Sequence, residues 1–165
     1  HGMDRNYLAD LIRPSGYFNQ KARKLHEFAV LVENDFNGDL DQLLDLPMYN
    51  LRTILLGIWG IGEETADDIV LYAAHKPSFV IDKYTRRIID RLGWRPRGVR
   101  YRDYQLMFTE QLPSDAALFN EYHALLDEHA STVCRPTPRC NQCCLQDICV
   151  ARTDAPSHGG KGQCP

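Results

Sequence analysis

The stretch "LLGIWGIGEETADDIVLYA", residues 55–73, decides the fold, because two helical segments meet at Gly60-Ile61-Gly62. Glycine adopts backbone angles closed to other residues and leaves its amide N–H group unobstructed. Together with the positive end of the next helix, such amides form a nest that can hold a phosphate. A plain helix–helix turn is the alternative. The acids Glu63 and Glu64 follow at once; they suit a helix N-terminus but sit poorly beside a phosphate.

The rest of the chain has the apolar spacing of helices. The pattern predicts helices over 4–13, 19–36 with Asn19 as N-cap, 39–46, 48–57, 63–74, 83–92, 101–111 and 115–131. Residues 75–82 are predicted to be extended and too short to seed a sheet. We expect an all-α domain over 1–132, with its hairpin at about 51–74, a cysteine loop over 133–152 and a disordered tail over 153–165.

The composition excludes a membrane protein, because no apolar run reaches the roughly 18 residues that a membrane span needs. We therefore expect a soluble, cytoplasmic protein. We also expect a monomer that associates with a prokaryotic nucleoid. The net charge is −3, but residues 83–102 carry eight basic residues and one acid. A basic stripe on a mildly acidic chain is typical of a nucleic-acid contact, with a solvated helix face as the plain alternative.

Five of the six cysteines lie within residues 134–149, which indicates a metal site in a reducing compartment rather than a disulfide framework. Cys134, Cys140, Cys143 and Cys149 are separated by five, two and five residues. Four thiolates satisfy either an iron–sulfur cluster or tetrahedral zinc, and the spacing does not choose between them.

Three stretches, in order along the chain, resemble the helix-hairpin-helix (HhH-GPD) DNA glycosylase superfamily of endonuclease III. They are "IRPSGYFNQKARKL" (12–25), "GIGEETADDIVLYAAHKPSFVIDKYTRRIIDRLG" (60–93) and "CRPTPRCNQCCLQDIC" (134–149). The resemblance implies a base-excision-repair enzyme that acts on double-stranded DNA containing a damaged base. It also favours a [4Fe–4S] cluster on the four cysteines. The first cysteine gap is one residue shorter than is usual in the family, and Cys144, where the family commonly has proline, is an alternative ligand to Cys143.

Asp82 stands where the family has its catalytic aspartate. A carboxylate there can stabilise the cationic sugar that forms as a base departs, or deprotonate the attacking water. Asp82 is also placed to cap the helix 83–92, and both roles are compatible. The amides of Gly60, Ile61 and Gly62 are expected to bind DNA phosphates. So are three basic side chains after Asp82, those of Lys83, Arg86 and Arg87.

Glu64 stands where strand-cleaving family members have a lysine whose amine forms a Schiff base. A carboxylate cannot do so, which predicts a monofunctional enzyme close to the 3-methyladenine glycosylases, acting on an alkylated base. One alternative is a bifunctional glycosylase/lyase that uses another amine, such as that of Lys83. By comparison with the family we expect the first helices to be absent from this sequence, so a second alternative is a truncated fragment or a non-catalytic DNA-binding module.

Three further side chains are candidates for the site. Tyr17, at a loop tip, is a candidate wedge that fills the stack when a base is flipped out, unless it packs into the core. Trp59 is expected in the core. His123 is either a pocket residue or a hydrogen-bonded core histidine.

Overall fold

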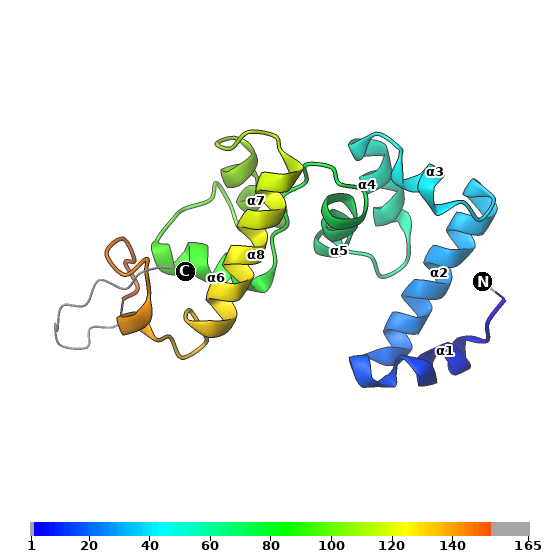
Figure 1. The fold of residues 1–165 in the computed structure, drawn as a ribbon, viewed down its shortest axis with the longest axis horizontal. Coiled ribbons are helices and arrows are strands. Elements are labelled where there is room, and N and C mark those ends of the chain that lie inside the picture. The colour runs from blue at the N-terminus through cyan, green and yellow to red at the C-terminus, as the bar shows by residue number, and fades with distance from the viewer. Residues whose placement is uncertain (1, 153–165) are drawn as a thin grey trace. The chain divides into compact units, whose positions relative to one another are not determined.

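The computed structural model of the chain describes residues 2–152, and every regular element in that range is a helix (Figure 1). The chain divides into two compact units between Ser78 and Phe79. No helix in the described range is both long and apolar enough to cross a bilayer. The predicted tail, 153–165, lies outside the described residues.

Unit 1 is built from short helices around the longer α2. In order they are α1 (Arg5–Leu11), the 3-10 turn η1 (Arg13–Ser15), α2 (Phe18–Phe36), α3 (Leu40–Leu44), α4 (Met48–Gly57), α5 (Glu63–Asp68) and the π-helical turn η2 (Ile69–Ala73). Local chemistry sets their ends. The Asp4 carboxylate accepts hydrogen bonds from the backbone amides of Asn6 and Tyr7 in the first turn of α1. Asn37 ends α2 in a left-handed conformation with φ of 53°.

The core of unit 1 holds the hairpin helices against α2 and α3. Its buried members are Val32, Leu43, Leu51, Leu55, Ile58, Ala66 and Val70. Leu51 and Leu55 are one helical turn apart on α4, so a single apolar face of that helix enters the core. The helices on both sides of the hairpin are therefore fixed by packing.

Unit 2 contains α6 (Lys83–Leu92), α7 (Tyr101–Thr109), α8 (Ala116–Thr132) and the 3-10 turn η3 (Cys140–Gln142). Gly93 ends α6 with φ of 75°, and the Asp115 carboxylate caps α8. At the start of α7 the Arg100 side chain and backbone amide both donate to Asp103, which lowers the pKa of that carboxyl. The core of unit 2 includes Phe79 stacked on Phe108, with their ring centroids 3.9 Å apart.

Two predictions about helices in unit 1 need correction. Asn19 is not the N-cap of α2, because the helix begins at Phe18 and Tyr17, in the left-handed region with φ of 47°, is the N-cap. The helix predicted over 63–74 is α-helical only to Asp68, where it widens into η2. There the Ala74 amide donates to the Ile69 carbonyl, five residues back.

Candidate functional site

The hairpin between α4 and α5 has the open backbone that its glycines predict. Gly60 has φ of 80°, a conformation that favours glycine. The Ile61 amide donates to the Ile58 carbonyl at 3.1 Å and closes the turn. Gly62 occupies the N-cap position of α5 and gives no side-chain cap, so no capping side chain covers the first amides of that helix.

Replacing Gly60 by alanine is expected to destabilise unit 1 by about 1–2 kcal/mol, because the left-handed conformation is costly once a Cβ is present. The new Cβ would also lie 2.9 Å from Lys24 Cε. Gly57→Ala is the matched control, because Gly57 lies in α4 and has nothing within 4 Å of its Cβ position. Urea unfolding gives the free energy of unfolding of each variant. Equal values for Gly60→Ala and Gly57→Ala would show that the conformation of Gly60 costs nothing when a Cβ is present.

Trp59 is not in the core, contrary to prediction, since 44% of the residue is exposed. The Arg23 guanidinium carbon lies 3.6 Å from the centroid of its ring. The Lys24 side chain packs against Gly60 in the same region. Neither basic residue was predicted to lie at the hairpin, because both belong to α2, far from it in sequence.

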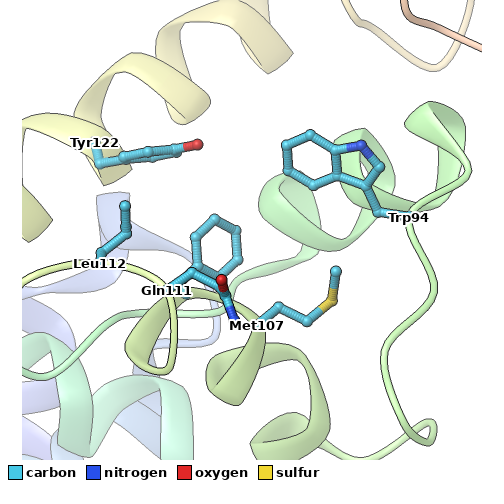
Figure 2. Close-up of a pocket in the computed structure, with 6 residues that line it drawn as sticks. Trp94, Met107, Gln111, Leu112 and Tyr122 are labelled. Atoms are coloured by element: carbon cyan, nitrogen blue, oxygen red, sulfur yellow. The ribbon is translucent and has the colours of Figure 1, made fainter.

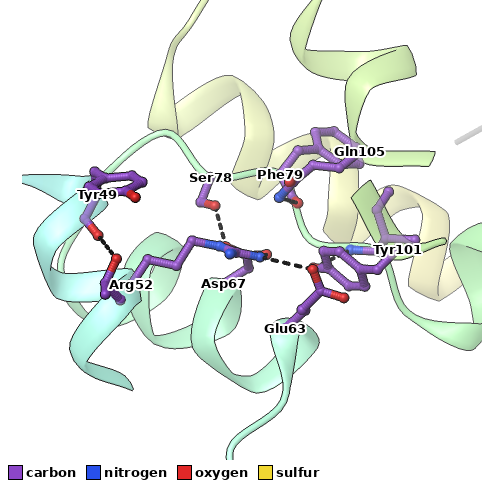
Figure 3. Close-up of polar contacts among 10 residues, drawn as sticks. Tyr49, Arg52, Glu63, Asp67, Ser78, Phe79, Tyr101 and Gln105 are labelled. Carbon is purple, nitrogen blue, oxygen red and sulfur yellow. Dashed lines mark hydrogen bonds and ion pairs between the residues drawn. The ribbon is translucent and has the colours of Figure 1, made fainter. Parts of the chain in front are cut away.

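A buried ion pair ties the two hairpin helices together (Figure 3). Asp67 of α5 is fully buried and accepts hydrogen bonds from Arg52 Nε at 2.8 Å and Nη2 at 3.1 Å. The Ser78 hydroxyl donates to the same carboxylate at 2.6 Å. Arg52 Nη2 also lies 3.6 Å from Glu63 Oε1. The arginine thereby offsets charge at both acids.

Asp82 is the N-cap of α6, where its Oδ1 accepts the Thr85 amide at 2.7 Å. Its side chain is only 14% exposed, and His123 Nε2 of α8 lies 4.0 Å from Oδ1. The segment before it is held in two places (Figure 3). The Ile81 amide donates to the Tyr101 hydroxyl, and the Gln105 amide group donates to the Phe79 carbonyl. The carboxylate is therefore rigidly placed beside an imidazole.

The predicted DNA-binding side chains differ in how far they are engaged within the protein. Lys83 Nζ lies 4.9 Å from the Tyr84 ring centroid, and Arg86 donates to the Val99 carbonyl at 3.2 Å. Arg87 donates to the Ala130 and Cys134 carbonyls, both at 2.8 Å, so it orders the cysteine loop. Tyr17, in unit 1, is 83% exposed at the loop before α2.

The cysteine loop is fastened to α6 chiefly through Arg91. Its guanidinium donates to the Cys134 and Arg135 carbonyls and contacts Cys134 Sγ at 3.2 Å. The Cys149 thiol in turn donates to the Arg91 carbonyl at 3.3 Å. Arg91 thus holds the first and last predicted ligands next to the same helix.

The four predicted ligand cysteines are all half-buried. Burial raises the pKa of the Cys143 thiol, and the three other thiols raise it further, so the sulfur atoms lie within electrostatic reach of one another. Within residues 2–152, their sulfur atoms are not arranged closely enough to count as a group of three or more ligands for one metal ion. The donor set nevertheless suits a metal or cluster, since burial and mutual repulsion of thiolates are what a bound cation relieves.

An apolar cavity of about 310 Å³ lies in unit 2 (Figure 2). It is lined by Trp94, Met107, Phe108, Gln111, Leu112 and Tyr122. Trp94 and Tyr122 face each other across it, and Gln111 supplies an amide. The lining residues include no carboxylate, imidazole or amine, and the Tyr122 phenol is the ionisable group among them.

Known proteins match this architecture in sequence and in structure. A protein of Methanocaldococcus jannaschii, whose assigned name of DNA repair glycosylase is provisional, is 38% identical over 91% of this chain and 69% of its own length. The endonuclease III of Sulfolobus acidocaldarius is 33% identical over 88% of this chain. The chain spans 63% of that relative.

Two solved structures share the fold. An endonuclease III in a non-covalent DNA complex has a TM-score of 0.74 at 21% identity, over 90% of this chain and 65% of that one. The H. pylori 3-methyladenine DNA glycosylase bound to 1,N6-ethenoadenine has a TM-score of 0.68 at 28% identity, over 79% of this chain and 64% of the glycosylase. The family model of HhH-GPD superfamily base excision DNA repair proteins matches residues 2–113. The predicted all-α helix-hairpin-helix fold is thereby confirmed, and the chain belongs to the HhH-GPD superfamily of base excision DNA repair proteins.

Proposed function

We propose that this chain hydrolyses the N-glycosidic bond of a damaged, alkylated base in double-stranded DNA and leaves the DNA strand uncut. The observation that carries the proposal is the rigid, mostly buried Asp82 beside His123, in a chain whose hairpin has Glu64 at the lysine position of the strand-cleaving enzymes.

The chemistry assigned to Asp82 follows from the charge of the reaction. As the bond between sugar C1′ and the base breaks, the electron pair leaves with the base and positive charge builds on the sugar. A fixed carboxylate stabilises that charge, and it can take a proton from the water that attacks C1′. An alkylated purine leaves readily because it already carries a positive charge. The likeness to a glycosylase solved with 1,N6-ethenoadenine supports a modified purine as substrate.

Strand cleavage needs an amine that attacks C1′ and forms a Schiff base. Glu64 cannot supply one, so water is the nucleophile and the product is an intact strand with an abasic site. The proposal is tested with methylated duplex DNA, by measuring the free base that the chain releases. Borohydride is added in a parallel sample to trap any Schiff base. Released base without a trapped complex is expected. Duplex binding without base release would instead support a non-catalytic module, and a trapped complex would support a lyase.

We further propose that Cys134, Cys140, Cys143 and Cys149 hold a [4Fe–4S] cluster, with Arg91 and Arg87 ordering the loop around them. The bound cluster would stabilise the loop and take no part in base removal. Iron and sulfide analysis of the purified protein is expected to find both, and Cys149→Ser is expected to lose them. A colourless protein loaded with zinc would contradict the cluster.

A further inference from the structure

The hairpin carries an unusual charge balance for a site that is to hold a phosphate. Glu63 and Glu64 are the first two residues of α5, directly after Gly62. Arg52 lies 3.6 Å from Glu63, but its guanidinium is already bidentate to the buried Asp67. The charge of Arg52 is therefore already balanced by acids of the hairpin helices themselves. Positive charge for a phosphate has to come from another element.

Two consecutive residues of α2 supply it, and each contacts one of two consecutive residues at the hairpin. Arg23 stacks on Trp59, with its guanidinium carbon 3.6 Å from the ring centroid. The Lys24 stem covers Gly60, with Cε 2.9 Å and Cγ 3.1 Å from the position that a Cβ would take. Because Nζ is one bond beyond Cε, the ammonium group is next to the hairpin. We name Arg23 and Lys24 the α2 cation pair.

Arg23 of the cation pair is also accessible to a ligand. Arg23 Nε is buried and has no hydrogen-bond partner among the described residues. Its ion pair with Glu27, at 3.9 Å, is loose, and 43% of the arginine side chain is exposed. Trp59, on which it stacks, is 44% exposed, so the site is open to a ligand. An oxyanion would bind the accessible part of the arginine side chain rather than the buried Nε, and a charge-assisted bond of this kind is stronger than one between neutral groups.

We propose that the α2 cation pair binds a backbone phosphate of duplex DNA at the hairpin and offsets the two acids of α5. This inference rests on the proposed function only in taking DNA as the ligand. It assigns phosphate binding to side chains of α2 as well as to the hairpin amides. Stacking on Trp59 holds the arginine in place, which lowers the conformational entropy lost when it binds.

The test measures binding to an undamaged 20-base-pair duplex by fluorescence anisotropy over a range of salt concentrations. The variants are Lys24→Met, which keeps the stem on Gly60, and Arg23→Gln. Each neutralised phosphate contact contributes about 0.9 to the slope of log K against log salt. Both variants are expected to weaken binding several-fold at low salt and to make the slope shallower by about 1. Lys24→Arg is expected to keep the wild-type slope.

Arg5→Gln is the control, because it removes one positive charge from an exposed position of α1 in the same unit. It is expected to leave the slope unchanged. Slopes of Lys24→Met and Arg23→Gln equal to that of Arg5→Gln would overturn the inference. Because the duplex is undamaged and no base is released, the result is independent of catalysis. A chain that binds through α2 but releases no base would refute the proposed function and leave the cation pair standing.

Discussion

Asp82→Asn is expected to lower the rate of base release by about 10²- to 10⁴-fold, the range found when a group acting on charge or protons in the transition state is removed. Asparagine has nearly the same shape but carries no charge, so it stabilises a sugar cation poorly and cannot take a proton from water. Duplex binding is expected to stay within about twofold, since the phosphate contacts assigned above do not involve this carboxylate. Single-turnover kinetics and anisotropy measure the two quantities separately.

This substitution also separates the two roles of Asp82. The residue caps α6 through the Thr85 amide at 2.7 Å. Asparagine caps a helix about as well as aspartate, so Asp82→Asn should unfold at nearly the wild-type temperature. Asp82→Ala loses the cap as well and is expected to cost about 1 kcal/mol. If Asp82→Asn kept wild-type turnover, the carboxylate would be a cap and nothing more.

Asp67→Ala is expected to lower the free energy of unfolding of unit 1 by about 3 kcal/mol, near the lower end of the range for breaking a buried ion pair. The removed carboxylate accepts three hydrogen bonds from Arg52 and Ser78 while fully buried. Its loss leaves the Arg52 guanidinium, which is only 25% exposed, with the looser contact to Glu63 at 3.6 Å. That residual exposure lets water relieve part of the penalty, hence the lower figure.

The measurement is urea unfolding followed by Trp59 fluorescence in a Trp94→Phe background, so that the signal comes from unit 1. Asp35→Ala, at an exposed position of α2, is the control and is expected to shift stability by less than about 0.5 kcal/mol. The double variant Arg52→Ala/Asp67→Ala should be less destabilised than the sum of the single variants, because neither charge is then left alone. Additive effects would show that the pair contributes little.

The bounds of the helices were predicted well where a proline, glycine or capping residue marks the helix end. The helix 48–57 follows Pro47, and the helix 83–92 lies between Asp82 and Gly93; both have those bounds in the structure. The sequence did not predict the π-helical turn at Ile69–Ala73, because the widening leaves no local signal in an apolar run.

The candidate site was predictable only where its residues are close in sequence. Gly60 and Gly62 were predicted from a local pattern, and Asp82 chiefly from the resemblance of its stretch to the family. The fully buried Asp67 was missed because it pairs with Arg52, fifteen residues away across the hairpin. The sequence offered one indication that Asp67 is buried, which is that it directly follows Ala66 on the apolar face of α5. The contacts of Arg23 with Trp59 and of Lys24 with Gly60 depend on how α2 packs, which periodicity does not show.

The central claim is that this chain removes a damaged base and leaves the strand intact. It is tested most directly with an end-labelled duplex containing one alkylated purine, incubated with the protein and analysed with and without hot alkali. The expected result is a full-length strand before alkali and a single cut at the lesion after it; with Asp82→Asn the strand should stay full-length even after alkali. A cut that appears without alkali, or no cut even after it, would contradict the account.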